Sequence, residues 1–184
     1  MAEHAEKERV MVFIDGANLY YALKELGWEK DIDYEKLGRL LSGERHLVRV
    51  YYFGAAASQE TSPQKHQRQQ EFFDRVRGMD YVTLSLGRLE RHGSVFVEKG
   101  VDVRIAVEMM RHAYRGTCDT LILVSADSDF VDLVEAVQDL GRHVEVAFPE
   151  PKFSWHLGRV PDRRHRLSAE QLAACKWENA RSGR

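Results

Sequence analysis

The chain of 184 residues carries 27 basic and 29 acidic side chains, and its formal net charge of -2 gives no overall attraction to nucleic acid. Because 43% of the residues are hydrophobic, the chain can bury a core and is not expected to be disordered. Cys118 and Cys175 form no CxxC pair, and neither the charged start nor any apolar run suits secretion or membrane insertion. We therefore expect a cytoplasmic protein with no membrane partner.

The first half of the chain alternates short apolar runs with helical patterns. Residues 10–14 form an unbroken apolar run that ends at Asp15 and Gly16, which is typical of a strand covered on both faces of a parallel sheet. A helical pattern follows and stops at Gly27, and a polar loop is expected at 58–63. Further strands are predicted at residues 47–53, 81–89 and 94–97, and further helices at 33–41 and 64–77.

The second half continues this alternation. Apolar residues recur at helical spacing from Val101 and indicate a helix that ends near Gly116; they are Val103, Ala106, Val107, Met110, Ala113 and Tyr114. A strand at 121–124, a helix at 130–140 and a strand at 143–148 follow. Strands that alternate with helices imply an α/β protein, with a three-layer α/β/α sandwich around a mostly parallel central sheet.

The chain reads as one domain with short extensions. We expect residues 1–9 to be a flexible N-terminus, residues 10–148 to form the domain, and residues 149–184 to be a tail rich in Pro and Arg. A helix at 168–177 would pack on the domain. The tail and the methionine-containing helix at 101–116 offer an apolar face, so a homodimer is one expectation.

Four aspartates are expected to converge at one edge of the sheet. Asp15 and Asp127 follow two apolar strands, Asp129 lies two residues further on, and Asp102 opens a helix at the same edge. Ligands of open α/β sheets bind beyond the carboxyl ends of the strands, where the strand order reverses. Carboxylates crowded there remain ionised when cations neutralise them, and an oxygen-only ligand set suits Mg²⁺ or Mn²⁺.

Helix capping is the alternative explanation for these residues. Asp102, Ser125, Asp127 and Ser128 each stand where an N-cap is favoured, and for any one of them alone the two explanations are about equally good. Two aspartates at strand ends together with a DxD pair favour the metal site.

Three ordered blocks of the sequence resemble one known family. FIDGANLYYAL, EKGVDVRIAVEMM and LILVSADSDFVDLVEAVQDLGRHVEV resemble the signature blocks of the NYN domain family, the LabA-like branch of the PIN-like nuclease superfamily. The resemblance covers residues 10–148. It implies a PIN-like α/β/α sandwich with a metal-dependent ribonuclease site.

The resemblance also assigns residues to that site. The family's acidic positions fall on Asp15, Asp102, Asp127 and Asp129, and its first-helix asparagine falls on Asn18. Two positions depart from the pattern: Ala126 replaces a glycine, and Glu108 stands where an aspartate is common.

The implied chemistry is hydrolysis of phosphodiester bonds by a metal-activated water. In this hypothesis Asp15 and Asp127 are the central ligands of Mg²⁺ or Mn²⁺, and Asp102 and Asp129 complete the set directly or through water. Asn18 would orient a water molecule or a substrate phosphate. Single-stranded RNA is the favoured substrate, because a flexible strand can place its phosphate on recessed metal ions.

Nucleic acid must still approach an acidic crevice. Lys99, Arg88 and Arg91 could form a basic rim that contacts phosphates, although for each of them taken alone a solvated surface charge is the better explanation; Lys99 is the best candidate of the three. Two other functions remain open. One is a LabA-like regulatory or adaptor module that binds RNA or protein without cutting, and the other is a DNA structure-specific nuclease, although the chain lacks long insertions that would arch over a flap.

Overall fold

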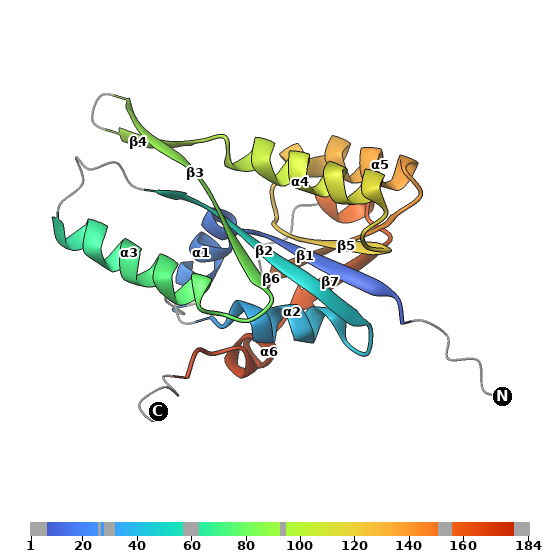
Figure 1. Ribbon diagram of the computed structural model, residues 1–184, viewed down its shortest axis with the longest axis horizontal. Coiled ribbons are helices and arrows are strands. Elements are labelled where there is room, and N and C mark those ends of the chain that lie inside the picture. Colours follow the sequence, from blue (N-terminus) through green and yellow to red (C-terminus); the bar gives the residue numbers. More distant parts are fainter. Residues whose placement is uncertain are drawn as a thin grey trace.

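A seven-stranded sheet forms the centre of the molecule (Figure 1). The computed structural model describes residues 7–25, 27, 32–56, 63–92, 95–150 and 156–178, with the backbone alone at residues 63, 65, 88–92 and 95–98. Its strands are β1 (Arg9–Asp15), β2 (His46–Ala56), β3 (Val82–His92), β4 (Val95–Lys99), β5 (Thr120–Val124), β6 (His143–Pro149) and β7 (Arg163–Leu167).

The strand order is β4-β3-β2-β1-β5-β6-β7. β4 pairs with β3 in the antiparallel sense, and the other six strands run parallel to one another. The predicted mostly parallel sheet is therefore confirmed. The antiparallel strand follows from the chain itself, since β3 and β4 are close in sequence and pair as a hairpin.

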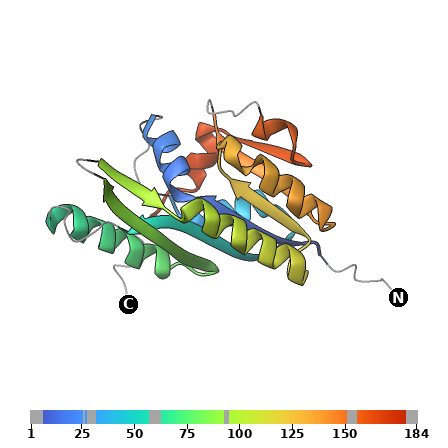
Figure 2. The same ribbon diagram turned by 90° about the horizontal axis from the view of Figure 1, so that it is seen from above.

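Helices cover both faces of this sheet. They are α1 (Gly16–Glu25), α2 (Tyr34–Ser42), α3 (Pro63–Arg77), α4 (Val101–Arg115), α5 (Val131–Asp139) and α6 (Ala169–Ala174), with 3-10 turns at η1 (Ser128–Phe130) and η2 (Leu157–Arg159). The helices α1, α2, α3 and α6 lie on one face, and α4 and α5 lie side by side on the other (Figures 1 and 2). Within the described ranges, none of these helices has the length and apolar character of a membrane span.

Two hydrophobic cores result from this arrangement. Along β1, Val10, Val12 and Ile14 face the core beneath α1 and α2, while Met11 and Phe13 face the core beneath α4 and α5. Successive side chains of a strand point to opposite faces, so an unbroken apolar run is what a strand covered on both sides requires. The three-layer α/β/α sandwich that the sequence predicts is confirmed.

The segment after Phe148 differs from the expected tail, because it adds a strand to the sheet. β7 pairs with β6 in parallel, and α6 packs against α2 with Leu172 fully buried. The sequence of β7 is Arg-Arg-His-Arg-Leu, and only Leu167 is buried. An edge strand that exposes charged residues carries no apolar pattern, which is why the sequence does not reveal it. The loop expected at 58–63 lies outside the described residues, apart from Pro63 at the start of α3.

Gly16 allows β1 to pass directly into α1. A Cβ atom at this position would lie 2.4 Å from both the Phe53 carbonyl oxygen and the ring of Tyr52 on β2. The backbone oxygen cannot move aside without breaking the sheet, so only glycine fits here. As a result Asp15 is both the last residue of β1 and the residue before α1.

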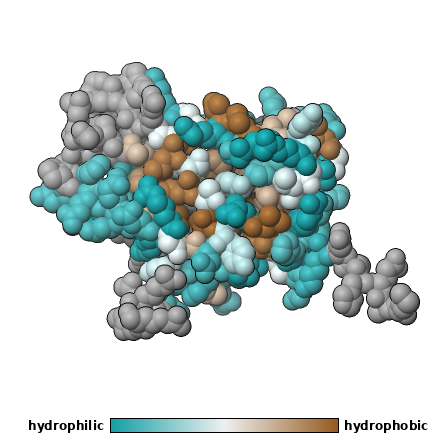
Figure 3. Space-filling view, viewed as in Figure 1, coloured by the Kyte–Doolittle hydropathy of each residue, from teal (hydrophilic) through white to brown (hydrophobic). Residues whose placement is uncertain are grey.

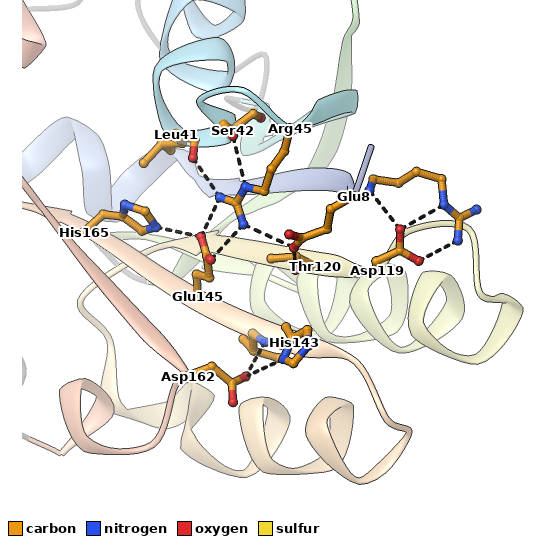
Figure 4. A network of polar contacts seen from close by, with 12 residues as sticks. Glu8, Leu41, Ser42, Arg45, Asp119, Thr120, His143, Glu145, Asp162 and His165 are labelled. Atoms are coloured by element: carbon orange, nitrogen blue, oxygen red, sulfur yellow. Dashed lines mark hydrogen bonds and ion pairs between the residues drawn. The ribbon is translucent and has the colours of Figure 1, made fainter. Parts of the chain in front are cut away.

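A buried ionic network joins the elements near the start of β2 (Figure 4). Arg45 Nη1 and Nη2 donate to the two carboxylate oxygens of Glu145 on β6 at 2.8 and 2.9 Å. His165 of β7 lies 2.7 Å from Glu145 through its Nε2 atom. Burial raises the pKa of Glu145, but the hydrogen bonds with His165 and Arg45 outweigh this and lower it to about 2. The network therefore fixes β6 and β7 to the segment that enters β2.

Glu145→Gln should lower the free energy of unfolding at pH 7 by about 3 kcal/mol, because it leaves Arg45 without its buried counter-ion. A carboxylate whose pKa is lowered in the folded state contributes its full stabilisation of that state above its ordinary pKa of 4.5. This contribution is lost as the pH falls towards 2. Urea unfolding from pH 7 to pH 3 should thus show a flatter pH dependence for the variant than for the wild type. Glu44→Gln, at an exposed position, is the matched control and should behave as wild type; parallel pH profiles for Glu145→Gln and wild type would contradict the assignment.

Candidate active site

The strand order reverses at β1, which lies between β2 and β5. The chain builds outward from β1 through β2 and β3 on one side, and through β5, β6 and β7 on the other. Ile14 of β1 pairs with Val124 of β5, so Asp15 and the segment after Val124 leave the sheet at neighbouring points. The expectation that the two aspartate-bearing strands are neighbours is confirmed, and the place is the switch point where ligands of such sheets bind.

Asp15 is held rigidly at this point, with only 5% of its surface exposed. Its Oδ1 atom accepts a hydrogen bond from the Asn18 backbone N–H at 3.1 Å, and its Oδ2 atom accepts one from the Ser125 hydroxyl at 3.2 Å. Burial raises the pKa of Asp15 and the two hydrogen bonds lower it, while the charges of Asp102 and Asp127 raise it further. The net shift is upward, so the folded protein disfavours the ionised form of this side chain.

Three more hydrogen bonds fix the loop that follows β5. The Ser125 hydroxyl accepts from the Asp127 backbone N–H at 3.1 Å, so this one group links both strand-end aspartates. Asn18 Oδ1 accepts from the Ala126 N–H at 3.0 Å. The Asp127 carboxylate accepts from the Asp129 N–H at 3.0 Å and thereby caps η1. The loop from 125 to 129 is therefore positioned by side chains of the site itself.

Capping explains part of this arrangement but not Asp102. Asp127 caps a 3-10 turn, and Asp15 accepts from a backbone N–H three residues ahead, as an N-cap does. The N-cap of α4, however, is Gly100, and no side chain caps it. Asp102 is exposed in the first turn of α4, but partial desolvation of its carboxylate raises its pKa, and the charges of Asp127 and Asp129 raise it further. Charge therefore connects Asp15 to Asp102 and Asp127, and Asp102 to Asp127 and Asp129, in one cluster at the strand ends, which we call the acidic crevice.

The donor set suits a hydrated hard cation. Among the described residues, no three His, Cys, Asp or Glu side chains are arranged to hold a metal ion together. Magnesium in proteins commonly keeps several water ligands and is bound by only one or two carboxylates. Such a set of oxygen donors, in which neighbouring carboxylates raise the pKa of Asp15 and Asp102, fits such an ion, and hydrogen bonds hold Asp15 and Asp127 in place.

The expected basic rim is only partly described. The β3–β4 register places Arg88 opposite Lys99 and Arg91 opposite Phe96, but the Arg88 and Arg91 side chains lie outside the described part of the chain. Lys99 is exposed at the end of β4, three residues before Asp102. The backbone therefore places Lys99 just before the start of α4, where Asp102 lies.

Ser125 is the site residue that the sequence assigned only to capping. The sequence position of Ser125 did point to the site, because it stands between an apolar strand and an acidic loop, yet a serine there usually serves as a cap. Its link between Asp15 and Asp127 depends on the pairing of β1 with β5, which is distant in sequence. Asn18 also has a structural function beyond the expected one, because its side-chain oxygen holds the loop at Ala126.

The fold and the acidic crevice define an α/β protein with a candidate functional site at the strand switch point. Residues 9–168 match the NYN domain, so the chain belongs to the NYN domain family, whose members are generally nucleases. It is similar to Low amplitude and bright protein LabA of Synechococcus elongatus, with 24% identity over 84% of this chain and 81% of LabA. It is also similar to the crystal structure of VPA0982, a protein of unknown function from Vibrio parahaemolyticus, with a TM-score of 0.66, 27% identity, and coverage of 91% of this chain and 98% of that one.

Ser125→Ala should lower the free energy of unfolding by about 1–3 kcal/mol, because it leaves Asp15 and the Asp127 N–H without their shared buried partner. Chemical denaturation measures the difference. Ser128→Ala is the matched control, since Ser128 is exposed in the same loop and should change stability by less than about 0.5 kcal/mol. Equal stability of the two variants would show that the Ser125 hydroxyl does not hold the loop.

Proposed function

We propose that this protein is a metal-dependent endoribonuclease that hydrolyses phosphodiester bonds of single-stranded RNA. The observation that carries the proposal is the acidic crevice, in which burial raises the pKa of Asp15 and the charges of Asp102 and Asp127 raise it further. Mutually repelling carboxylates cost stability, and a bound cation removes that cost. Membership of the NYN domain family supports the nuclease class.

We assign a role to each of the four aspartates from its hydrogen bonds and its exposure. Asp15 and Asp127 are the direct ligands in this proposal, because hydrogen bonds fix both of them. Asp102 and Asp129 are more exposed and reach the ion directly or through water. When bound, Mg²⁺ or Mn²⁺ supplies a Lewis acid for the phosphate and lowers the pKa of water.

Other side chains bind and orient the substrate. The Ala126 N–H donates to the side-chain oxygen of Asn18. The Nδ2 group at the other end of the amide is then the donor for a substrate phosphate. Lys99, just before the start of α4, and Arg88 and Arg91 on the neighbouring strand contact phosphates further along the RNA. The reaction needs no Ser, Cys or His nucleophile, and its products carry a 5′-phosphate and a 3′-hydroxyl.

Asp15→Asn and Asp127→Asn should each lower the rate of RNA cleavage at least about 100-fold, since each removes a charge that holds the ion at the reacting phosphate. The assay follows 5′-labelled single-stranded RNA and matched DNA with Mn²⁺, Mg²⁺ or EDTA. Asp74→Asn is the matched control, because Asp74 is exposed on α3 away from the crevice, and it should cleave as wild type does. Cleavage that persists in both site variants would contradict the assignment.

A regulatory module that binds RNA or protein without cutting is the second candidate. It is favoured by one observation, namely that no three carboxylates of the described residues are close enough to share a metal ion. The same assay separates the two functions. If wild-type protein retains RNA on a filter but does not cleave it with any of the metal ions, the protein is the binding module and not the nuclease.

Mn²⁺ should raise the melting temperature of the wild type by about 5–10 °C at a concentration near 100 times its Kd. Asp15→Asn should abolish this rise. Without metal at pH 7, Asp15→Asn should melt no lower than wild type, because the raised pKa means that the charged form of Asp15 is disfavoured by folding. Differential scanning calorimetry tests both statements, with Asp74→Asn as the control that keeps the response. A metal-dependent rise in Asp15→Asn equal to that of wild type would place the ion elsewhere.

A further inference from the structure

The outward face of α4 carries an apolar stripe. Val103, Val107, Met110 and Tyr114 recur every three or four residues, which places them in one line along the helix. Val103 is 66% exposed, Val107 58% and Tyr114 82%. They are three of the six large hydrophobic side chains that are exposed among the described residues. In Figure 3, which has the view of Figure 1, hydrophobic residues lie at the upper edge of the molecule, where α4 runs.

Packing within the domain accounts for one part of this stripe only, because Met110 is half-buried against the core while Val103, Val107 and Tyr114 are exposed. α4 buries its other face in the core through Val101, Ile105 and Met109. An amphipathic helix on a domain surface normally turns polar residues outward, so α4 is apolar on two sides. The spacing of the outward residues is that of a coiled-coil seam, with valine and methionine among them. A seam of this kind is stabilised when a second helix covers it.

The two sides of the stripe carry opposite charges. Glu108 and Arg111 lie near Tyr51 of β2, so this flank of α4 is on the β2 side of the sheet; Arg104, Arg111 and Arg115 are exposed along it. On the other side lies α5, which packs against α4 and β6. The exposed residues of α5 are Asp132, Glu135 and Asp139. Glu108 pairs with Arg111 on the β2 flank, and the three arginines leave that flank with a net positive charge. The surface is thus basic, apolar and acidic in three parallel bands.

We propose that a second copy of this chain covers the stripe, in a homodimer whose two α4 helices pack in parallel about a two-fold axis along the seam. Rotation about such an axis brings the basic band of each copy onto the acidic band of its partner. An antiparallel pair would instead face arginine with arginine. In the parallel pair Arg104, one turn into α4, meets the partner's α5 near its start at Asp132. The flanking charges therefore select the orientation, as they do in coiled coils.

The dimer does not depend on the proposed function, but it would affect how the site meets RNA. α4 begins beside the acidic crevice, at Asp102. Parallel helices place both crevices at the same end of the dimer, opening on the same side. One strand of RNA can then run across both sites.

Sedimentation equilibrium of the full chain over a range of concentrations tests the dimer. Wild type should dimerise reversibly, and Val107→Glu should raise the dissociation constant about tenfold or more by burying a charge in the seam. Tyr21→Glu is the matched control, because Tyr21 is 62% exposed on α1, on the other face of the sheet, and it should dimerise as wild type. Wild type that stays monomeric at every concentration, or dimers equally stable in all three proteins, would overturn the proposal.

Charge exchange tests the orientation and does not depend on the apolar seam. Arg104→Glu alone and Asp132→Lys alone should each weaken dimerisation, while an equimolar mixture of the two variants should form a heterodimer as stable as wild type. Circular dichroism confirms that both remain folded. In an antiparallel dimer Arg104→Glu would strengthen association, and that result would overturn the parallel arrangement. So would a mixture of the two variants that dimerises no more strongly than either variant alone.

Discussion

Repulsion among carboxylates at the strand switch point is the interaction on which the site depends. Asp15 is buried, and the charged side chains that shift its pKa are two further carboxylates, Asp102 and Asp127. The fold tolerates this cost because backbone geometry fixes where the groups stand. Gly16 lets β1 pass straight into α1, and the Ser125 hydroxyl links Asp15 to the loop after β5. The chain's own hydrogen bonds and backbone therefore fix where these carboxylates stand.

A second buried carboxylate shows what the crevice lacks. Glu145 is as buried as Asp15, but Arg45 and His165 bond to it and its pKa falls to about 2, while the pKa of Asp15 rises. Burial alone acts in the same direction on both groups. The difference comes from the cationic partners, which the protein supplies at Glu145. At Asp15 a divalent cation would perform the same task, and this contrast supports a metal site more strongly than the number of aspartates does.

Much of this architecture could be predicted from periodicity and from the ends of strands. The unbroken run at β1 and the aspartates after β1 and β5 were sufficient to predict a mostly parallel sheet with an acidic edge. β7 was not predictable, because an edge strand with three exposed arginines has no apolar pattern. The link through Ser125 depends on a pairing across more than a hundred residues. The apolar residues that marked α4 as a helix include Val103 and Val107, which the fold turns outward rather than into the core.

Anomalous diffraction from crystals grown with Mn²⁺ tests the central claim, that the acidic crevice binds a divalent cation, most directly. The account predicts an anomalous peak beside the carboxylates of Asp15 and Asp127, with Asp102 and Asp129 within one water of it, and no such peak in crystals of Asp15→Asn. An ordered crevice without a peak at saturating Mn²⁺, or a peak only at another place, would contradict it.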